Sequence, residues 1–243
     1  MRHVADKVRV VAELVLKGRW ASAFRRLRRW ISWDTLAYGL RRDLSVPFEA
    51  PPAKIPLAVR PLRESDIERL VGEQGTALTG DEAFQLKSSL ALFRLGIRTC
   101  YVATTLDDQP CFLQWLIGST ENERLLKYYK GFHAPLAPDQ ALMEYGFTLK
   151  PLRGRGIMSC ALARIAEKGR ELGVRWVITY VSQRNPAALK GCKRAGFSPY
   201  LLRRESWRFF RRRVSFTLLP AGTPYPFEAP ATSQSSEPAP SSN

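Results

Sequence analysis

The sequence predicts a mixed α/β sheet covered by helices. Residue patterns typical of strands and of helices alternate through positions 57–219, and strand-like segments follow one another directly at both ends of this region. Between two of these segments, Asp107-Asp108-Gln109-Pro110 is typical of a hairpin turn. Antiparallel pairs at the ends and strand-helix alternation between them predict a sheet with both parallel and antiparallel neighbours.

Residues 1–46 are expected to form a basic amphipathic helical extension before this sheet. Apolar residues recur at helical spacing up to Ile31, and the other positions are rich in arginine and tryptophan. Such a segment fits either a helix on a membrane surface or helices packed on their own domain with the basic face in solvent. The proline-rich segment 47–56 cannot continue a helix, so we expect a connector and a domain boundary there.

The domain at 57–219 is expected to contain strands and helices in a regular order. The expected strands are short runs rich in β-branched and aromatic residues, at 57–62, 98–105, 111–119, 143–151, 174–182 and as a final pair within 197–219. The expected helices begin after Ser65 or Asp66, cover about 82–95, run from Ile157 to a stop at Gly173, and begin again at Asn185-Pro186. Residues 220–243 are rich in proline, serine and alanine and are predicted to be a disordered tail.

Charge and cysteine content limit the classes of protein. The chain has 38 lysines and arginines against 22 aspartates and glutamates, and the net charge of +16 favours anionic partners. The four cysteines form no C-x-x-C pair and no signal peptide precedes them, so we expect free thiols, a reducing compartment and no bound metal. No apolar run approaches the roughly 20 residues that cross a bilayer. We therefore predict a cytoplasmic protein whose membrane contact is at most peripheral, on the inner face.

Arg153-Gly154-Arg155-Gly156 lies between an expected strand and an expected helix. The N-terminus of a helix carries partial positive charge and unpaired N–H groups, which suits a pyrophosphate. Glycines let the backbone approach such a group closely, and the arginines can add charged hydrogen bonds. The alternative is a basic turn in which the glycines serve only the geometry.

At this point the chain resembles the GNAT superfamily of acyl-CoA-dependent N-acyltransferases. Arg153, Gly156 and Met158 occupy the first, fourth and sixth positions of the family motif R/Q-x-x-G-x-G/A, and Met158 departs from it. The segment NPAALKGCKRAGF, 185–197, is similar to a second signature of the family. The resemblance covers residues 57–219 and implies the GNAT fold, with acetyl-CoA or another acyl-CoA as co-substrate and no metal.

The resemblance also implies roles for individual residues. The strand before the glycine turn pairs with the pantetheine arm in the family, and the turn holds the pyrophosphate. This implies the cofactor-binding residues Phe147, Thr148, Leu149, Arg153, Gly154, Arg155, Gly156, Ile157, Met158 and Asn185.

Three residues are candidates for catalysis. Glu144 stands where relatives keep a carboxylate that accepts the proton of the amine, although an ordinary strand-end glutamate is the alternative. His133, in the preceding loop, is a second candidate base or a structural histidine. Cys192 falls where the family has a tyrosine that protonates the leaving thiolate, and it is either that acid or a small buried residue that makes room for the cofactor.

The identity of the acceptor is predicted only as a class. The aromatic side chains of Tyr128, Tyr129 and Phe132 suit an acceptor with an apolar or ring-like part, unless they only pack in the core. We first expect N-acetyl transfer to a small-molecule amine or amino sugar. A long-chain acyltransferase that docks on an acidic acyl carrier protein or anionic membrane, through 1–46 and the basic segment 203–213, is a second possibility.

Two further classes stay open at this point. One is a non-catalytic acyl-CoA-binding protein, since Met158 and Cys192 depart from the family pattern. The other is a nucleic-acid-binding protein, which the dispersed positive charge argues against. The oligomeric state stays open, a homodimer included.

Overall fold

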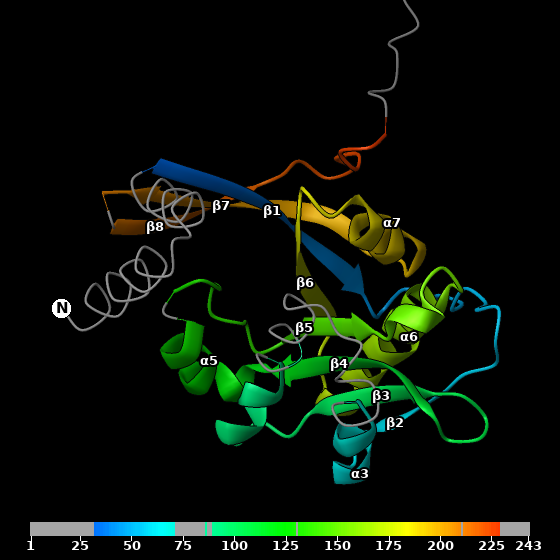
Figure 1. Ribbon diagram of the computed structural model, residues 1–243. Coiled ribbons are helices and arrows are strands. Elements are labelled where there is room, and N and C mark those ends of the chain that lie inside the picture. The colour runs from blue at the N-terminus through cyan, green and yellow to red at the C-terminus, as the bar shows by residue number, and fades with distance from the viewer. Residues whose placement is uncertain (1–31, 71–85, 87–88, 130, 210, 229–243) are drawn as a thin grey trace, which may run out of the picture.

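The computed structural model describes residues 32–70, 86, 89–129, 131–209 and 211–228 (Figure 1). These residues contain an eight-stranded mixed sheet in the order β2-β3-β4-β5-β6-β1-β7-β8. The strands are β1 (Ser32–Asp43), β2 (Ala58–Pro61), β3 (Cys100–Thr104), β4 (Pro110–Gly118), β5 (Gln140–Thr148), β6 (Trp176–Ser182), β7 (Ser198–Arg208) and β8 (Arg211–Leu218). The helices are α3 (Glu64–Glu68), α5 (Asn122–Tyr129), α6 (Ile157–Glu167) and α7 (Pro186–Arg194), with short 3₁₀ turns at Ser119–Glu121, Lys150–Leu152 and Lys168–Leu172. The predicted mixed sheet is confirmed.

The order of elements within 57–219 follows the sequence prediction. Each expected strand is present, β5 and β6 are parallel, and the other strand pairs are antiparallel. Gly173 ends the helical segment in a left-handed conformation, as its lack of a side chain allows. The helix expected at 82–95 lies partly outside the described residues, and positions 89–94 are helical.

Strand β1 corrects the expected extension and domain boundary. Residues 32–43, assigned to a helical extension, lie between β6 and β7 and pair antiparallel with both. The segment 47–56 therefore connects two strands of one sheet instead of two domains. The sequence predicted a helical extension here because the basic composition of residues 1–31 continues through Arg41 and Arg42. The strands that pair with β1 lie more than 130 residues away, so no local pattern indicates them. The helices expected at 1–31 lie outside the described residues.

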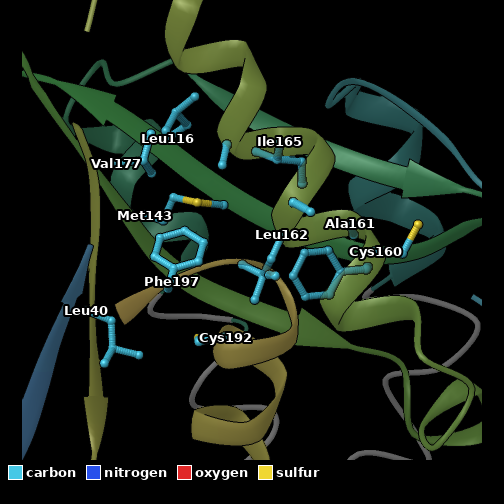
Figure 2. Close-up of a cluster of buried hydrophobic side chains, with 14 of the residues drawn as sticks. Leu40, Leu116, Met143, Cys160, Ala161, Leu162, Ile165, Val177, Cys192 and Phe197 are labelled. Carbon is cyan, nitrogen blue, oxygen red and sulfur yellow. The ribbon is translucent and has the colours of Figure 1, made fainter. Parts of the chain in front are cut away.

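The main hydrophobic core lies between α6 and the sheet (Figure 2). Leu116, Met143 and Val177, from three neighbouring strands, belong to the same buried cluster as the α6 residues Leu162 and Ile165. Because apolar side chains recur every three or four residues along α6, one face of the helix is buried continuously.

Strand β1 is fastened to this layer by a buried arginine. Arg42 donates a hydrogen bond of 2.8 Å to the backbone oxygen of Ala163 and pairs with Glu167 near the end of α6. Its guanidinium also lies 4.6 Å from the ring centroid of Phe48. The burial of a charge is tolerated here because it is both paired and hydrogen-bonded.

The first part of the predicted disordered tail is folded. Tyr225 is 4% exposed and its hydroxyl donates a hydrogen bond of 2.7 Å to the backbone oxygen of Phe197. The proline- and serine-rich composition of 220–243 concealed this aromatic anchor. Residues 229–243 lie outside the described part of the chain.

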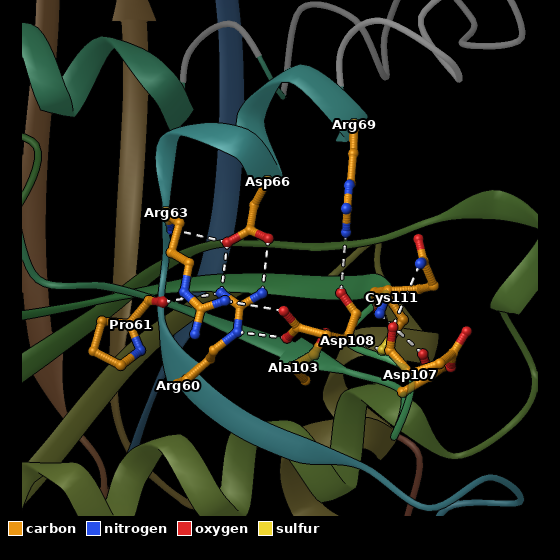
Figure 3. Close-up of polar contacts among 11 residues, drawn as sticks. Arg60, Pro61, Arg63, Asp66, Arg69, Ala103, Asp107, Asp108 and Cys111 are labelled. Carbon is orange, nitrogen blue, oxygen red and sulfur yellow. Dashed lines mark hydrogen bonds and ion pairs between the residues drawn. The ribbon is translucent and has the colours of Figure 1, made fainter.

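A polar network joins β2, α3 and the β3–β4 turn (Figure 3). Asp66, 1% exposed, accepts hydrogen bonds of 2.6 and 2.9 Å from Arg60 and one of 2.8 Å from the backbone N–H of Arg63. Arg60 also donates 2.7 Å to Asp108 in the turn. Helix α3 thus begins at Glu64, and Asp66 closes its N-terminus from the third helical position instead of preceding the helix.

Candidate active site

The candidate site lies where β5 and β6 separate. The two parallel strands pair only from Gln140 to Met143 on β5 and from Trp176 to Thr179 on β6. Beyond these residues β5 stays paired with β4 alone, as the register at 147–148 shows. The edge of β5 that faces β6 is therefore free along its second half.

A bulge at the separation point sets the direction of β5. The register shifts opposite Gln114, and Tyr145 adopts a φ of +55°, an uncommon conformation for a residue with a side chain. Gln114 holds the bulge by donating a hydrogen bond of 2.7 Å to the backbone oxygen of Glu144. A Cβ on Gly146 would lie 2.4 Å from the Gln114 side-chain oxygen, so glycine is needed there. Glu144 is thus the residue directly before the strained position, next to the point where β5 leaves β6.

A groove of about 790 Å³ continues from the free half of β5 to the start of α6 and along α7. Gly154 and Gly156 have φ values of +77° and +75°, as the glycine turn predicted. Gly156 precedes the first turn of α6, whose N–H groups have no partner within the helix. Of the expected cofactor-binding residues, those that line the groove are Phe147, Thr148, Arg153, Gly154, Gly156, Ile157, Met158 and Asn185.

The other two expected cofactor residues lie elsewhere. Leu149 is 4% exposed, and its N–H donates to the backbone oxygen of Cys111 on β4, so it is turned away from the groove. Arg155 is exposed, and its backbone oxygen accepts a hydrogen bond of 2.8 Å from Lys54. Both differences arise from backbone pairing that residue types alone do not reveal.

Polar groups of the groove have local partners. The Nε of Arg153 donates 3.1 Å to the backbone oxygen of Thr148, which ties the turn to the end of β5. The Asn185 side chain accepts 3.0 Å from Ala188 and caps α7, as expected from its position. Lys190 and Arg194 on α7 add positive charge along the same wall.

Met158 fits the groove because α7 has a glycine opposite it. A Cβ on Gly191 would lie 3.1 Å from the Met158 sulfur, so the thioether packs against the bare backbone of α7. The larger residue at the sixth motif position is thereby accommodated by a smaller one on the neighbouring helix.

Glu144 and His133 lie close together where β5 and β6 separate, two residues before the part of β5 that lines the groove. Their Oε1 and Nε2 atoms are 3.4 Å apart, and their side chains are 16% and 4% exposed. Burial raises the pKa of Glu144 to about 7, although nearby Arg203 and the Tyr145 N–H lower it in part. Burial, and then the Arg203 charge, lower the pKa of His133 to about 3. At neutral pH the histidine is therefore neutral, and the carboxyl is divided between its protonated and ionised forms.

Arg203 belongs to this cluster and was missed by the sequence analysis. It is 8% exposed, and its guanidinium lies 3.7 Å from the ring centroid of Phe132 and 4.6 Å from that of Tyr180. The alternation of side chains along a strand could have identified it, because Arg203 is two residues after Leu201 and shares the buried face of β7 with it. The run of basic residues in 203–213 hides one buried arginine among exposed ones.

The expected acceptor-binding aromatics surround the same cluster. The Tyr129 ring meets the His133 ring edge-on at 4.3 Å and stacks near Tyr145 at 6.4 Å. Phe132 covers the other side of His133 at 5.2 Å, and Tyr128 packs edge-on against Tyr129 at 4.9 Å. The structure thus brings together Glu144, His133 and all three predicted aromatic residues.

Cys192 lies apart from this cluster, in the hydrophobic core (Figure 2). Its side chain is 2% exposed and does not line the groove, and burial raises the pKa of its thiol to about 12. These observations favour the packing interpretation over the acid. Among the described residues, no group of three or more His, Cys, Asp or Glu could hold a metal ion. No helix in the described part of the chain is long and apolar enough to cross a membrane.

Comparison with known proteins identifies the family. Residues 57–198 match the family model of the acetyltransferase (GNAT) domain. The chain therefore belongs to the GNAT acetyltransferase family, whose members transfer acyl groups from an acyl-CoA co-substrate. No curated protein sequence matches the chain.

Two solved structures are similar in fold. One contains a GCN5-related glucosamine N-acetyltransferase region of a fungal multi-domain GH3 β-N-acetylglucosaminidase, with a TM-score of 0.54 and 18% identity over 78% of this chain and 23% of that one. The other is a GCN5-related N-acetyltransferase from Sphaerobacter thermophilus, with a TM-score of 0.49 and 18% identity over 77% of this chain and 57% of that one. This chain thus spans less than two thirds of either protein, and the likeness to the first concerns the fold alone.

Proposed function

We propose that the protein transfers an acetyl group from acetyl-CoA to the primary amine of a small molecule such as an amino sugar, with Glu144 as the base. The observation that carries this proposal is the position of Glu144. Its carboxyl, with a pKa of about 7, lies at the separation of β5 and β6, two residues before the segment of β5 that lines the groove. A base with a pKa near the working pH is suited to proton transfer.

The groove fits an extended, anionic thioester. The free edge of Phe147 and Thr148 offers backbone groups to an amide-containing arm, and the first turn of α6 offers N–H groups to a pyrophosphate. Lys190 and Arg194, which line the same groove, supply positive charge for an anionic ligand. When bound, acetyl-CoA supplies an activated acyl group.

The chain's own residues then handle the proton of the acceptor. The amine nitrogen forms a bond to the acyl carbon as the carbon–sulfur bond breaks, and the proton leaves the nitrogen for Glu144. His133 is neutral near pH 7 and lies 3.4 Å from the carboxyl, so its Nε2, which has no hydrogen-bond partner in the described structure, is the nearest polar group to that carboxyl on this side. The thiolate takes its proton from water, since Cys192 lies in the core.

Two measurements test the proposal. Thermal shift with CoA, acetyl-CoA and longer acyl-CoAs should show stabilisation that increases with ligand concentration. Thiol release with acetyl-CoA and a panel of amines, glucosamine included, should then rise above hydrolysis alone. A shift with CoA and no transfer to any amine would indicate a non-catalytic binding protein, and no shift at all would remove both functions.

Peripheral docking on an anionic membrane is a second candidate, favoured by the β7–β8 hairpin. Phe209 at its tip is 77% exposed, and the exposed Arg211 and Arg213 follow on β8. Apolar and cationic side chains together suit an anionic lipid surface. Because β8 is the edge strand, charges that prevent edge-to-edge pairing are the competing explanation.

Co-sedimentation with vesicles separates these explanations. Full-length protein should pellet with phosphatidylserine vesicles and less with neutral ones, and Phe209→Ser should reduce pelleting. Equal pelleting of the Ser variant would leave edge protection as the role of the hairpin.

A further inference from the structure

Arg203 is a buried cation whose hydrogen bonds leave most of its donors unused. Its two hydrogen bonds to described groups both come from Nη1, at 3.4 Å to the backbone oxygen of Phe132 and 3.4 Å to Nδ1 of His133. A guanidinium has five N–H donors. Within the described part of the chain, Nε and Nη2 have no protein acceptor, and neither is among the fully buried atoms that lack a partner, so both are open to solvent or to a ligand.

The fold directs Arg203 toward the site across β1. Ala37 of β1 lies directly opposite Arg203, and Gly39 lies opposite Tyr180 of β6, so the four residues share one face of the sheet. Ala37 is among the smallest residues and leaves the long side chain of Arg203 a path to the Tyr180 and Phe132 rings, whereas the space over Gly39 is filled by Leu201 and Tyr200. A bulky residue at position 37 would occupy this path.

The rings hold the guanidinium without neutralising it. Phe132 and Tyr180 contribute cation–π attraction, but a buried charge is stabilised fully only by an anion and by hydrogen bonds to its donors. Glu144 attracts the charge electrostatically, yet no ion pair within 4.0 Å joins the two among the described residues. Glu144 is also the group that must receive a proton in the proposed reaction.

We propose that Arg203 binds a carboxylate of the acceptor, so that the substrate is an amine that also carries a carboxylate. The planar guanidinium matches a carboxylate with two parallel hydrogen bonds, and the ring contacts fix its plane in advance. The amine of such an acceptor faces Glu144 while its carboxylate faces Arg203. This inference rests on the proposed acyl transfer and narrows its acceptor from small amines in general, simple amino sugars included, to amines that carry a carboxylate.

The first test compares acceptors in matched pairs. A panel of amino acids is assayed with acetyl-CoA beside the corresponding carboxamides, in the full-length wild-type protein, Arg203→Met and Arg203→Lys. The matched control is Arg204→Met, because Arg204 is the exposed neighbour on the opposite face, paired with Asp34 at 2.9 Å.

The expected result is a loss of discrimination. Wild-type kcat/KM should be about 10- to 100-fold higher for at least one acid than for its amide, the effect of losing charged hydrogen bonds. Arg203→Met should remove this ratio by lowering the value for the acid, and Arg204→Met should keep it. Equal losses for acid and amide would show that Arg203 only supports Glu144, and an absent preference in wild type would equally overturn the inference.

A second readout works without turnover. If no amine is acetylated, the proposed function fails, and carboxylate binding is measured alone by thermal shift with the same amino acids in the presence of CoA. Stabilisation of wild type and Arg204→Met, but not of Arg203→Met, supports the inference. Equal shifts in all three proteins, or none in wild type, reject it; a preference for phosphate-bearing amines over carboxylates rejects the assigned anion.

Discussion

Replacing Glu144 with glutamine is expected to slow acyl transfer and to stabilise the protein at alkaline pH. Glutamine has nearly the shape of the protonated glutamate, but it cannot accept the proton of the amine. Removal of a general base typically lowers turnover by about 10²- to 10⁴-fold. Wild-type turnover should rise as pH approaches about 7 and then level off, because only the ionised carboxyl is the base.

The change in stability follows from the same pKa. The folded protein holds the Glu144 proton up to about pH 7, whereas the unfolded chain releases it near 4.5. The folded pKa is the higher one, so this group destabilises the fold progressively as pH rises from about 4.5 to about 7. The difference between the two pKa values corresponds to about 3 kcal/mol. The glutamine variant has no carboxyl at this position and so does not lose this stability as pH rises. His133 also titrates, but its contribution to stability is the same in both proteins and cancels in the comparison.

The assay is chemical unfolding of both proteins across pH, beside steady-state turnover. The free energies of unfolding should nearly coincide around pH 4.5 and differ by about 3 kcal/mol at pH 8, with the variant more stable. Parallel stability curves would show that Glu144 has an ordinary pKa. Unchanged turnover in the variant would remove Glu144 from the mechanism.

Three other substitutions test the turn, the polar network and the core. Gly156→Ala introduces a Cβ at φ +75° and 3.3 Å from a backbone oxygen, so it should lower the free energy of unfolding by about 1–2 kcal/mol and weaken CoA binding in thermal shift. The control is Gly173→Ala, which is also at positive φ but in open space and should leave CoA binding unchanged. Asp66→Asn breaks a buried ion pair and should lower the free energy of unfolding in urea by about 3 kcal/mol. The same change at the half-exposed Asp108 should lower it by less than about 1 kcal/mol. Similar losses in the two variants would contradict the burial assigned to Asp66. Cys192→Ala should lower stability by about 1 kcal/mol while kcat per folded molecule stays the same, and a lower kcat with full stability would restore the thiol as an acid.

Local patterns predicted most of the elements and part of the site. Helical spacing, the cap at Asn185 and the glycines at 154 and 156 depend on residues near in sequence, and the structure has each as expected. The family resemblance added Glu144 and the aromatic residues around it. These lie together because the loop before β5 folds back over the point where β5 leaves β6.

The remainder of the site depends on pairing between distant segments. Arg203 reaches the cluster across β1, whose Ala37 lies opposite it, and no local pattern encodes the insertion of β1 between β6 and β7. The bulge at Tyr145 likewise depends on Gln114, which hydrogen-bonds the backbone oxygen of Glu144 thirty residues later. The hydrogen bond from the Leu149 N–H to Cys111 on β4 likewise follows from the register that this bulge sets.

The place of β1 also constrains the order of events during synthesis. This strand leaves the ribosome early, but both of its partners, β6 and β7, emerge only after residue 176. It must stay unpaired until most of the chain has been made, and its late closure is a long-range step that slows folding. Residues 57–198 alone, although they match the family model, would lack the strand that fills the sheet between β6 and β7.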